Sequence, residues 1–439
     1  MPDSLTLLER LLETINKNSI PLVKLRYKPL ERPGAFSGDF DFVTSEASLN
    51  QILQTIFDLA TDMNISFSID RTKFTKTKVT LFDTADQYIE LEIWTILEVK
   101  DPARRTLRYI FWEDLAAHLV REENGIAALP LELEALYYLS HLFTKTKNLE
   151  GEEIRLRLEY YRTKLDETNK QQTLELFNML IDGESTLREA ALSANTELID
   201  RGILLERMRL ASRKKEYRLK TRTEWYTFKN SLRKLERFIP LVGPDGVGKT
   251  TLIESLSEAF KKRSRYYRFK KTFRGSIIYN TIYPILKRMA LRRMQMKKID
   301  KNQVDDLFGQ TIFYIALIKY TLFILTNLII RKYVFADRFF YDFLFQDMRF
   351  ADRPATLRTN WKTLLKRSPG TYWLIQLDAP ADVIFQRKQE LSREDIATYR
   401  KEIFHFYLGK PSVLYTYINT ANPLETCTGV LNKNSRIIH

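Results

Sequence analysis

The chain has 439 residues, of which 44% are hydrophobic and 28% charged, so it holds enough apolar material for about two or three folded domains. Its single cysteine, Cys427, excludes an internal disulfide and a cysteine-based zinc site, and its four histidines are too widely spaced for a histidine metal centre. The net charge of +15 is concentrated in residues 201–240 (13 basic, 4 acidic) and 261–300 (14 basic, 1 acidic).

Two basic segments of this kind suit polyanions such as nucleotides, nucleic acid or anionic lipid head groups. A solvated basic helix face has the same composition, so polyanion contact through 201–240 and 261–300 is a hypothesis. The interleaved aromatic and basic residues of SRYYRFKKTFRG (264–275) would also suit base stacking, but they form no complete RNA-binding motif.

The N-terminal third predicts an α+β region. Residues 1–18 place leucines at helical spacing, and this acidic amphipathic segment lacks the basic start and apolar run of a signal peptide, so we expect a cytoplasmic protein. Between 20 and 100, short apolar or alternating runs surround one helical stretch, 47–62.

Four carboxylates stand out in this region. Asp39 and Asp41 lie two residues apart in the extended run GAFSGDFDFVT (34–44), so both face the same side, and such a pair can hold metal ions near a triphosphate. Glu90 and Glu92 share one face of a later strand, YIELEIW, and Glu92 would complete the metal site. Ser37 and Gly38 would allow phosphate to approach closely. An acidic strand edge without chemistry is the plain alternative.

This arrangement resembles the G-x-D-x-D pattern of the nucleotidyltransferase superfamily over roughly residues 20–150. Gly34-Ala35 stands where the usual Gly-Ser helix start would be, and the later carboxylate is Glu rather than Asp. The resemblance implies a nucleotidyltransferase-like α+β domain over 1–128, with Asp39, Asp41 and Glu92 as metal ligands. A domain of this fold that only binds its ligand is the alternative.

Residues 129–236 predict a helical, basic connecting region, and an α/β domain begins at 237. There the apolar strand FIPLVG is followed by GPDGVGKT (243–250), which fits G-x-x-x-x-G-K-[ST] completely, and then by the helical pattern TLIESLSEAFKK. Backbone amides of such a loop bind phosphate oxygens, a lysine reaches the β- and γ-phosphates, and a hydroxyl ligates Mg²⁺. The predicted cofactor-binding residues are Gly243, Pro244, Asp245, Gly246, Val247, Gly248, Lys249, Thr250 and Thr251.

Three later segments suggest phosphoryl transfer. KYVFADRFFYD (332–342) is an apolar strand ending in Asp337, a candidate Mg²⁺ ligand, and Arg338, a candidate phosphate ligand. TYWLIQLDAPADVIFQRK (371–388) is a buried strand, an Asp-Ala-Pro turn and a helix. Its Arg387 and Lys388, with Arg393 just beyond, would form a lid that neutralises the transferring phosphate. YINTANPLETCTGVLNK (417–433) predicts a last strand and helix.

In order and spacing, GPDGVGKTT, the strand ending in DRF and LDAPADVIFQRK resemble the thymidylate kinase family over residues 235–439. The resemblance implies a parallel five-stranded sheet wrapped by helices, ATP and Mg²⁺ as cofactors, and Asp245 near the acceptor and the metal. Val247 occupies a loop position where some members carry a catalytic arginine. The stretch 307–320, where members usually carry an arginine that reads thymine, has none, so we expect an acceptor other than thymidine monophosphate.

The apolar segment 312–330 is long enough to cross a bilayer, but Lys319 and Asn327 interrupt it and strand-like segments flank it, so we expect a core helix and no membrane span. The sequence thus predicts a P-loop kinase that transfers phosphate to a phosphorylated or hydroxylated acceptor, with Lys249, Arg338, Arg387, Arg393 and Asp245 as catalytic residues. The alternatives are a nucleotidyltransferase and a non-catalytic nucleotide- or nucleic-acid-binding protein. A homodimer is compatible with each.

Overall fold

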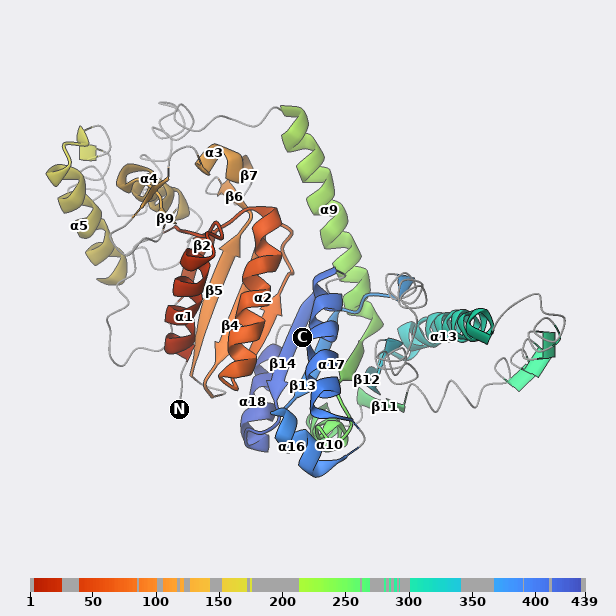
Figure 1. Cartoon of the computed structure of the whole chain (residues 1–439). Helices are drawn as coiled ribbons and strands as arrows, with labels where there is room; N and C mark the ends of the chain where they lie inside the picture. The colour runs from red at the N-terminus through yellow and green to blue at the C-terminus, as the bar shows by residue number, and fades with distance from the viewer. Residues whose placement is uncertain are drawn as a thin grey trace.

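The structure is a computed structural model of the whole chain (Figure 1). It describes residues 4–25, 39–84, 87–100, 106–116, 119–121, 127–142, 152–171, 174–175, 213–260, 263–268, scattered positions between 280 and 292, 301–340, 367–389, 391–409 and 413–435. Ser37, Gly38, the stretch 176–212 and most of the basic segment 261–300 therefore lie outside the described residues.

Among the described residues, twelve strands form one continuous sheet in the order β11-β12-β10-β13-β14-β3-β4-β5-β2-β1-β9-β8. The first five of these are parallel to one another. This confirms the prediction of an α/β fold. Their bounds are Phe238–Val242 (β10), Ser264–Arg268 (β11), Tyr333–Asp337 (β12), Trp373–Asp378 (β13) and Leu414–Asn419 (β14).

Four of these five strands, β10 and β12 to β14, are buried at every position, as their unbroken apolar runs predict for strands covered on both faces. The fifth, β11, is a partly exposed edge strand. The strand that leads into the GPDGVGKT loop, β10, lies between β12 and β13. The chain leaves β10 toward one edge of the sheet and leaves β13 toward β14 on the other side. In open α/β sheets, ligands bind at the carboxyl ends of two such neighbouring strands.

Beyond β14 the sheet continues into the N-terminal part of the chain, where the pairing is mixed. Strand β14 pairs antiparallel with β3, and β2 pairs parallel with β5. A separate hairpin joins Ile96–Lys100 (β6) to Thr106–Phe111 (β7). The remaining bounds are Ser66–Asp70 (β3), Lys76–Phe82 (β4), Tyr88–Trp94 (β5), Asp39–Val43 (β2), Val23–Lys24 (β1), Ala127–Ala128 (β9) and Val120–Arg121 (β8).

Helices cover both faces of the sheet (Figure 1). One apolar cluster packs four of them against one face: Ser4–Lys17 (α1), Glu46–Asp62 (α2), Lys301–Ile330 (α13) and Arg393–Gly409 (α17). A second cluster packs three on the other face: Lys249–Phe260 (α10), Ala381–Arg387 (α16) and Leu424–Ser435 (α18). A third surrounds Trp112–Ala116 (α3), Leu131–Leu142 (α4) and Glu152–Glu167 (α5).

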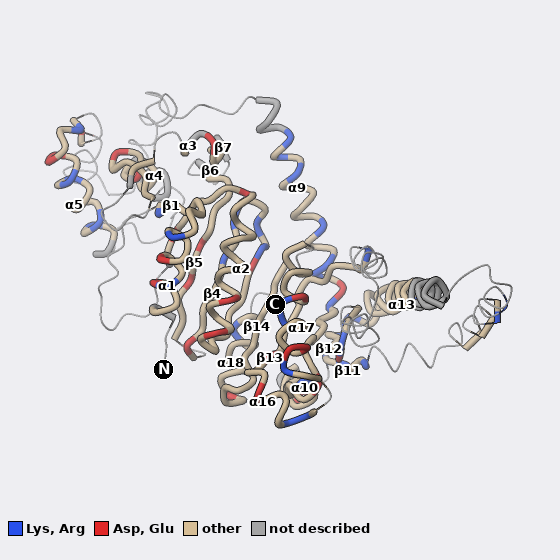
Figure 2. The backbone as a smooth tube through the Cα atoms, in the orientation of Figure 1, with Lys and Arg blue, Asp and Glu red and all other residues tan. Residues whose placement is uncertain are grey.

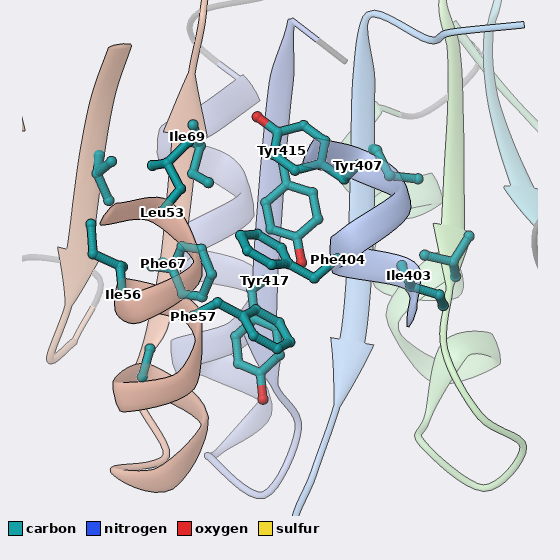
Figure 3. Packing of buried hydrophobic residues seen from close by; sticks show 14 of the residues in the cluster. Leu53, Ile56, Phe57, Phe67, Ile69, Ile403, Phe404, Tyr407, Tyr415 and Tyr417 are labelled. Carbon is teal, nitrogen blue, oxygen red and sulfur yellow. The ribbon is translucent and has the colours of Figure 1, made fainter. Parts of the chain in front are cut away.

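Residues 1–128 and 237–439, predicted as separate domains, contribute to one apolar cluster. Phe57 of α2 stacks on Phe404 of α17 with ring centroids 4.1 Å apart, and Phe67 of β3 stacks on Tyr417 of β14 at 5.2 Å (Figure 3). The backbone N–H of Asn419 donates to the Ser66 hydroxyl. The N-terminal region and the loop-bearing region are therefore joined by one sheet and one apolar cluster, and the division at residues 128 and 236 remains a prediction.

The helix Arg213–Glu236 (α9) lies across this joint. Near its middle, the Tyr226 hydroxyl donates to the backbone carbonyl of Arg71, in the N-terminal region. At its end, the side chain of Asn327 on α13 donates to the carbonyl of Glu236. The helix α9 therefore connects the two parts of the chain and also makes contacts with each of them.

The apolar segment predicted at 312–330 forms most of α13. Within the described residues, the window Phe313–Ile330 is the one helix long and apolar enough to cross a membrane. One third of that window is buried, against the sheet. The sequence predicts a core helix, whereas α13 is buried along one side and exposes Ile318, Leu322 and Leu325 on the other. The absence of a membrane span remains a prediction.

Candidate functional site

The GPDGVGKT loop joins β10 to α10 at the carboxyl edge of the parallel strands, as predicted. Two of its glycines have a backbone angle that residues with a side chain rarely adopt: Gly246 and Gly248 both have φ of +89°. Gly243 sits so close to β13 that an added Cβ would lie 2.4 Å from the Leu377 carbonyl oxygen. The glycines are required at these positions because other residues would strain or displace the loop.

Lys249, the first residue of α10, turns back over the loop. Its buried ammonium group donates hydrogen bonds to the carbonyls of Gly243, at 2.6 Å, and Pro244, at 2.8 Å. Thr250 and Thr251 follow in the first helical turn, and both are exposed. The loop therefore combines a helix N-terminus, a lysine and a hydroxyl, the groups that bind phosphate and its counter-cation.

Val247 has a different environment from the rest of the loop. Its side chain is fully buried and belongs to the apolar cluster beneath the loop, together with Leu252 and Ile253. At this position the chain therefore anchors the loop to the core.

Asp245 is the centre of a cluster of cations. Its Oδ1 accepts from the Arg338 guanidinium at 2.5 Å and lies 3.7 Å from the Lys249 ammonium, while its Oδ2 lies 3.8 Å from the Lys388 ammonium. Three cations around one carboxylate leave an excess of positive charge at the loop. Such an excess favours a polyanionic ligand.

Asp337 ends the neighbouring strand, β12, and Arg338 follows it directly. Asp337 pairs in register with Leu241 of β10, and the Arg338 N–H donates to the Leu241 carbonyl, so both residues lie beside the loop. Arg338 has φ of +75°, which is strained for a residue with a side chain. This backbone turn coincides with the contact of its guanidinium with Asp245.

Asp337 has the features of a cation ligand. Its carboxylate is buried, and Oδ2 accepts from the Tyr266 hydroxyl at 3.1 Å. The other oxygen, Oδ1, is buried without a hydrogen-bond partner in the part of the chain that the structure describes. A buried carboxylate oxygen needs a partner, and Mg²⁺ is bound by one or two protein oxygens together with phosphate and water. A bound cation would supply the partner that Asp337 Oδ1 lacks.

Two residues of β11, which the sequence did not identify as site residues, also lie at this site. Tyr266 and Arg268 are two apart in a strand and lie on the same face. The Arg268 guanidinium Nε is 3.8 Å from Asp337 Oδ2, and its side chain is largely exposed. Recognising SRYYR as a parallel edge strand of the same sheet, rather than as a nucleic-acid motif, would have found both.

The predicted lid divides into two parts. The end of α16 lies against the loop, since a Cβ on Gly246 would be 3.0 Å from Lys388 Cβ and 3.6 Å from Arg387 Cβ. Lys388 also contacts Asp245, so it is the lid cation closest to the loop carboxylate. Arg393 instead forms an ion pair with Asp382 of α16 and lies over the Phe385 ring, within the lid itself.

A buried polar network supports the strand beside the loop. Asp378, which ends β13, is almost fully buried, and its carboxylate pairs with Arg400 of α17 and accepts from the Tyr417 hydroxyl at 2.8 Å. Burial raises the pKa of Asp378, while the Arg400 charge opposes that rise. The network ties α17, and hence the end of the lid, to the sheet.

The N-terminal carboxylates come together only in part. Asp41 of β2 lies in register beside Glu92 of the parallel neighbour β5, and Asp39 lies beside Glu90. Glu92, however, forms an ion pair with Lys76 at 2.5 Å, and Glu90 with Lys78 at 2.5 Å. The structure therefore places Asp41 next to Glu92, as predicted, but a lysine already neutralises Glu92. The described residues contain no group of three metal-ligating side chains.

No protein-family model matches this chain, and no curated protein is similar enough to be matched. The likeness to thymidylate kinases and to nucleotidyltransferases therefore rests on the residues and their arrangement.

Proposed function

We propose that the chain is an ATP- and Mg²⁺-dependent phosphotransferase, similar to nucleoside monophosphate kinases, whose donor site is the loop between β10 and α10. The observation that carries this proposal is the cation cluster of Arg338, Lys249 and Lys388 around Asp245, set at the N-terminus of α10. Phosphoryl transfer depends mainly on positioning and charge neutralisation, which such a cluster supplies.

In this proposal the loop amides and Lys249 hold the β- and γ-phosphates of ATP. Thr250 and Asp337 would hold Mg²⁺, which would neutralise charge on the phosphates when bound. Binding of the triphosphate draws the Lys249 ammonium from the carbonyls of Gly243 and Pro244 to the phosphate oxygens. Lys388 and Arg387, at the end of α16, neutralise charge on the transferring group. Arg393 holds the lid through its ion pair with Asp382.

The acceptor would bind on the side of β11 and β12, where Arg338, Arg268 and Tyr266 gather near Asp337. These groups favour an acceptor that is itself phosphorylated. An acceptor phosphate oxygen attacks the γ-phosphorus of ATP, the bond from that phosphorus to the β–γ bridging oxygen breaks, and ADP leaves. Because the attacking oxygen is already anionic, this step needs no general base.

An acceptor screen with γ-labelled ATP tests the proposal on the wild type and on Lys249→Ala. The control is Lys17→Ala, which removes an exposed lysine on α1, far from Lys249 in the sequence. We expect label transfer to at least one phosphorylated acceptor, lost by 10²-fold or more in Lys249→Ala and retained in Lys17→Ala. Full activity in Lys249→Ala would refute the donor site. ATP binding without transfer to any acceptor would leave a nucleotide-binding protein instead.

A second candidate function, nucleotidyl transfer, is favoured by the register of Asp41 beside Glu92. It requires Glu92 to leave Lys76 when a metal–nucleotide complex binds, because the ion pair now uses that carboxylate. Its test is pyrophosphate release from nucleoside triphosphates. Release that is lost in Asp41→Asn but retained in Lys249→Ala would support it, and no release with any triphosphate would reject it.

A further inference from the structure

The outer face of α9 carries an exposed apolar stripe. Trp225, Phe228, Leu232 and Leu235 follow one another at intervals of three and four residues, which places them on one side of a helix. Their exposed fractions are 63%, 53%, 49% and 56%. Side chains of this size are normally covered, and a continuous exposed row of them marks an interaction surface.

The opposite face of the same helix is already occupied. Leu219 and Asn230 are buried there, and Tyr226 bonds to the backbone of Arg71. Asn327 of α13 holds the helix end through the Glu236 carbonyl. The stripe is therefore held outward by a helix that cannot rotate to bury it without breaking these contacts.

Positive charge surrounds the stripe. Between residues 218 and 236, α9 has six basic and two acidic residues, a net charge of +4, and the blue segments along α9 in Figure 2 show this charge. One of the two acids, Glu236, accepts from the Tyr320 hydroxyl in the joint with α13. The Arg233 charge lowers the pKa of Lys229, so like charges are crowded on this helix.

We infer that this face of α9 docks on an anionic lipid bilayer. A row of tryptophan, phenylalanine and leucine side chains about 15 Å long, flanked by lysine and arginine, matches a helix that lies in the plane of a membrane interface. The tryptophan and the leucines enter the boundary between head groups and acyl chains, and Arg218 and Lys229 contact lipid phosphates.

The charge of α9 and the side chains of its exposed stripe argue against two other partners, a second copy of the chain and nucleic acid. A second copy of the chain would bring two +4 helices together, which like-charge repulsion opposes. Nucleic acid would use the basic residues and the aromatic rings, but it offers the two leucines nothing to pack against. An anionic bilayer satisfies both the charges and the leucines. This inference is independent of the phosphotransferase proposal.

Vesicle flotation with the full chain tests it, comparing phosphatidylcholine vesicles with mixed phosphatidylcholine–phosphatidylserine vesicles. We expect binding to the mixed vesicles and little to the zwitterionic ones. Each charge removed by Arg218→Gln or Lys229→Gln should weaken binding about five-fold. Leu235→Ser should weaken it about ten-fold. The matched controls are Leu424→Ser, an exposed leucine on α18, and Arg155→Gln on α5.

Tryptophan fluorescence gives a second, direct measurement. Trp225 emission should shift to shorter wavelength on the mixed vesicles, and Trp225→Phe should remove the shift while the protein still binds. The inference is overturned if the protein binds neither kind of vesicle, or if the α9 variants bind as well as the wild type. It is also overturned if the control variants lose as much binding as the α9 variants. Self-association or oligonucleotide binding that depends on Leu235, without vesicle binding, would also overturn it.

Discussion

Arg338 and Asp245 are 93 residues apart in the sequence, yet the guanidinium of one bonds to the carboxylate of the other at 2.5 Å. This contact joins the end of β12 to the phosphate loop. It also explains why Arg338 is held at a φ of +75°, since the backbone must turn at the strand end to aim the side chain at the loop.

The first prediction concerns this pair. Arg338→Gly is expected to unfold at nearly the same temperature as the wild type, because glycine relieves a backbone strain of roughly 1–3 kcal/mol that offsets the lost ion pair. Phosphoryl transfer should fall by 10²-fold or more. Arg338→Lys keeps the charge but loses the planar fork, so it should raise KM for the acceptor more than KM for ATP. Unchanged phosphoryl transfer in both variants would show that Arg338 has no part in the reaction.

The second prediction compares two loop glycines. Gly243→Ala should destabilise the fold by about 2–4 kcal/mol, because its Cβ would meet the Leu377 carbonyl oxygen. Gly248→Ala has open space around the added Cβ and should cost only about 1–2 kcal/mol from its positive φ. Chemical denaturation of both variants measures the difference. Equal losses would contradict the close approach of the loop to β13.

The third prediction is a pH dependence of stability that comes from Glu236. Burial raises the pKa of Glu236 to about 7 from its ordinary value of 4.5. Between these two values the folded protein binds more protons than the unfolded chain, so this contribution is fully present below pH 4.5 and is lost as the pH rises through 7.

Glu236→Gln should therefore be more stable than the wild type at pH 8, by an amount on the order of 1–3 kcal/mol. The gain should disappear at pH 4, where the wild-type carboxyl is also neutral. Unfolding in denaturant at the two pH values measures it, and Glu224→Gln, an exposed carboxylate on the same helix, should change stability by less than about 0.5 kcal/mol at either. A gain at pH 4 as large as at pH 8 would rule out titration of Glu236 as the cause.

The fourth prediction tests the shared core. Phe404→Ala should destabilise the protein by about 3–5 kcal/mol, because it removes a fully buried ring that stacks on Phe57 across the joint. Both parts of the chain should then unfold in one transition at a lower temperature, as calorimetry would show, while the exposed neighbour His405→Ala should have little effect. Two transitions, of which only one moves, would mean that the parts fold independently.

Much of the site could be predicted because its signals are local. The loop from Gly243 to Thr250 needs glycines at defined backbone angles and a lysine at the start of a helix, and these requirements fall on adjacent residues. Strands such as Tyr333–Asp337 are unbroken apolar runs that end in a polar residue. Their type and their carboxyl ends could be read without knowing their neighbours.

Contacts between distant segments could not be predicted in this way. Nothing in SRYYR indicates that β11 pairs beside β12 and brings Tyr266 to Asp337. Nothing in YIELEIW or KTKVTLF indicates that Lys76 would neutralise Glu92, because that pairing depends on the register of two strands. Lys388 and Arg393 look equivalent in the sequence, and only the packing of α16 directs one to the loop and the other to Asp382.

The sequence by itself determined the α/β class, the strand–loop–helix unit and the chemistry that its residue types allow, since each depends on neighbouring residues and short-range periodicity. Only the tertiary structure decided that both parts of the chain share one sheet through β14 and β3, which cations surround Asp245, and which faces of α9 and α13 stay exposed. The physical reason is that strand pairing and side-chain packing are chosen by the free energy of the whole fold, to which residues hundreds of positions apart contribute together.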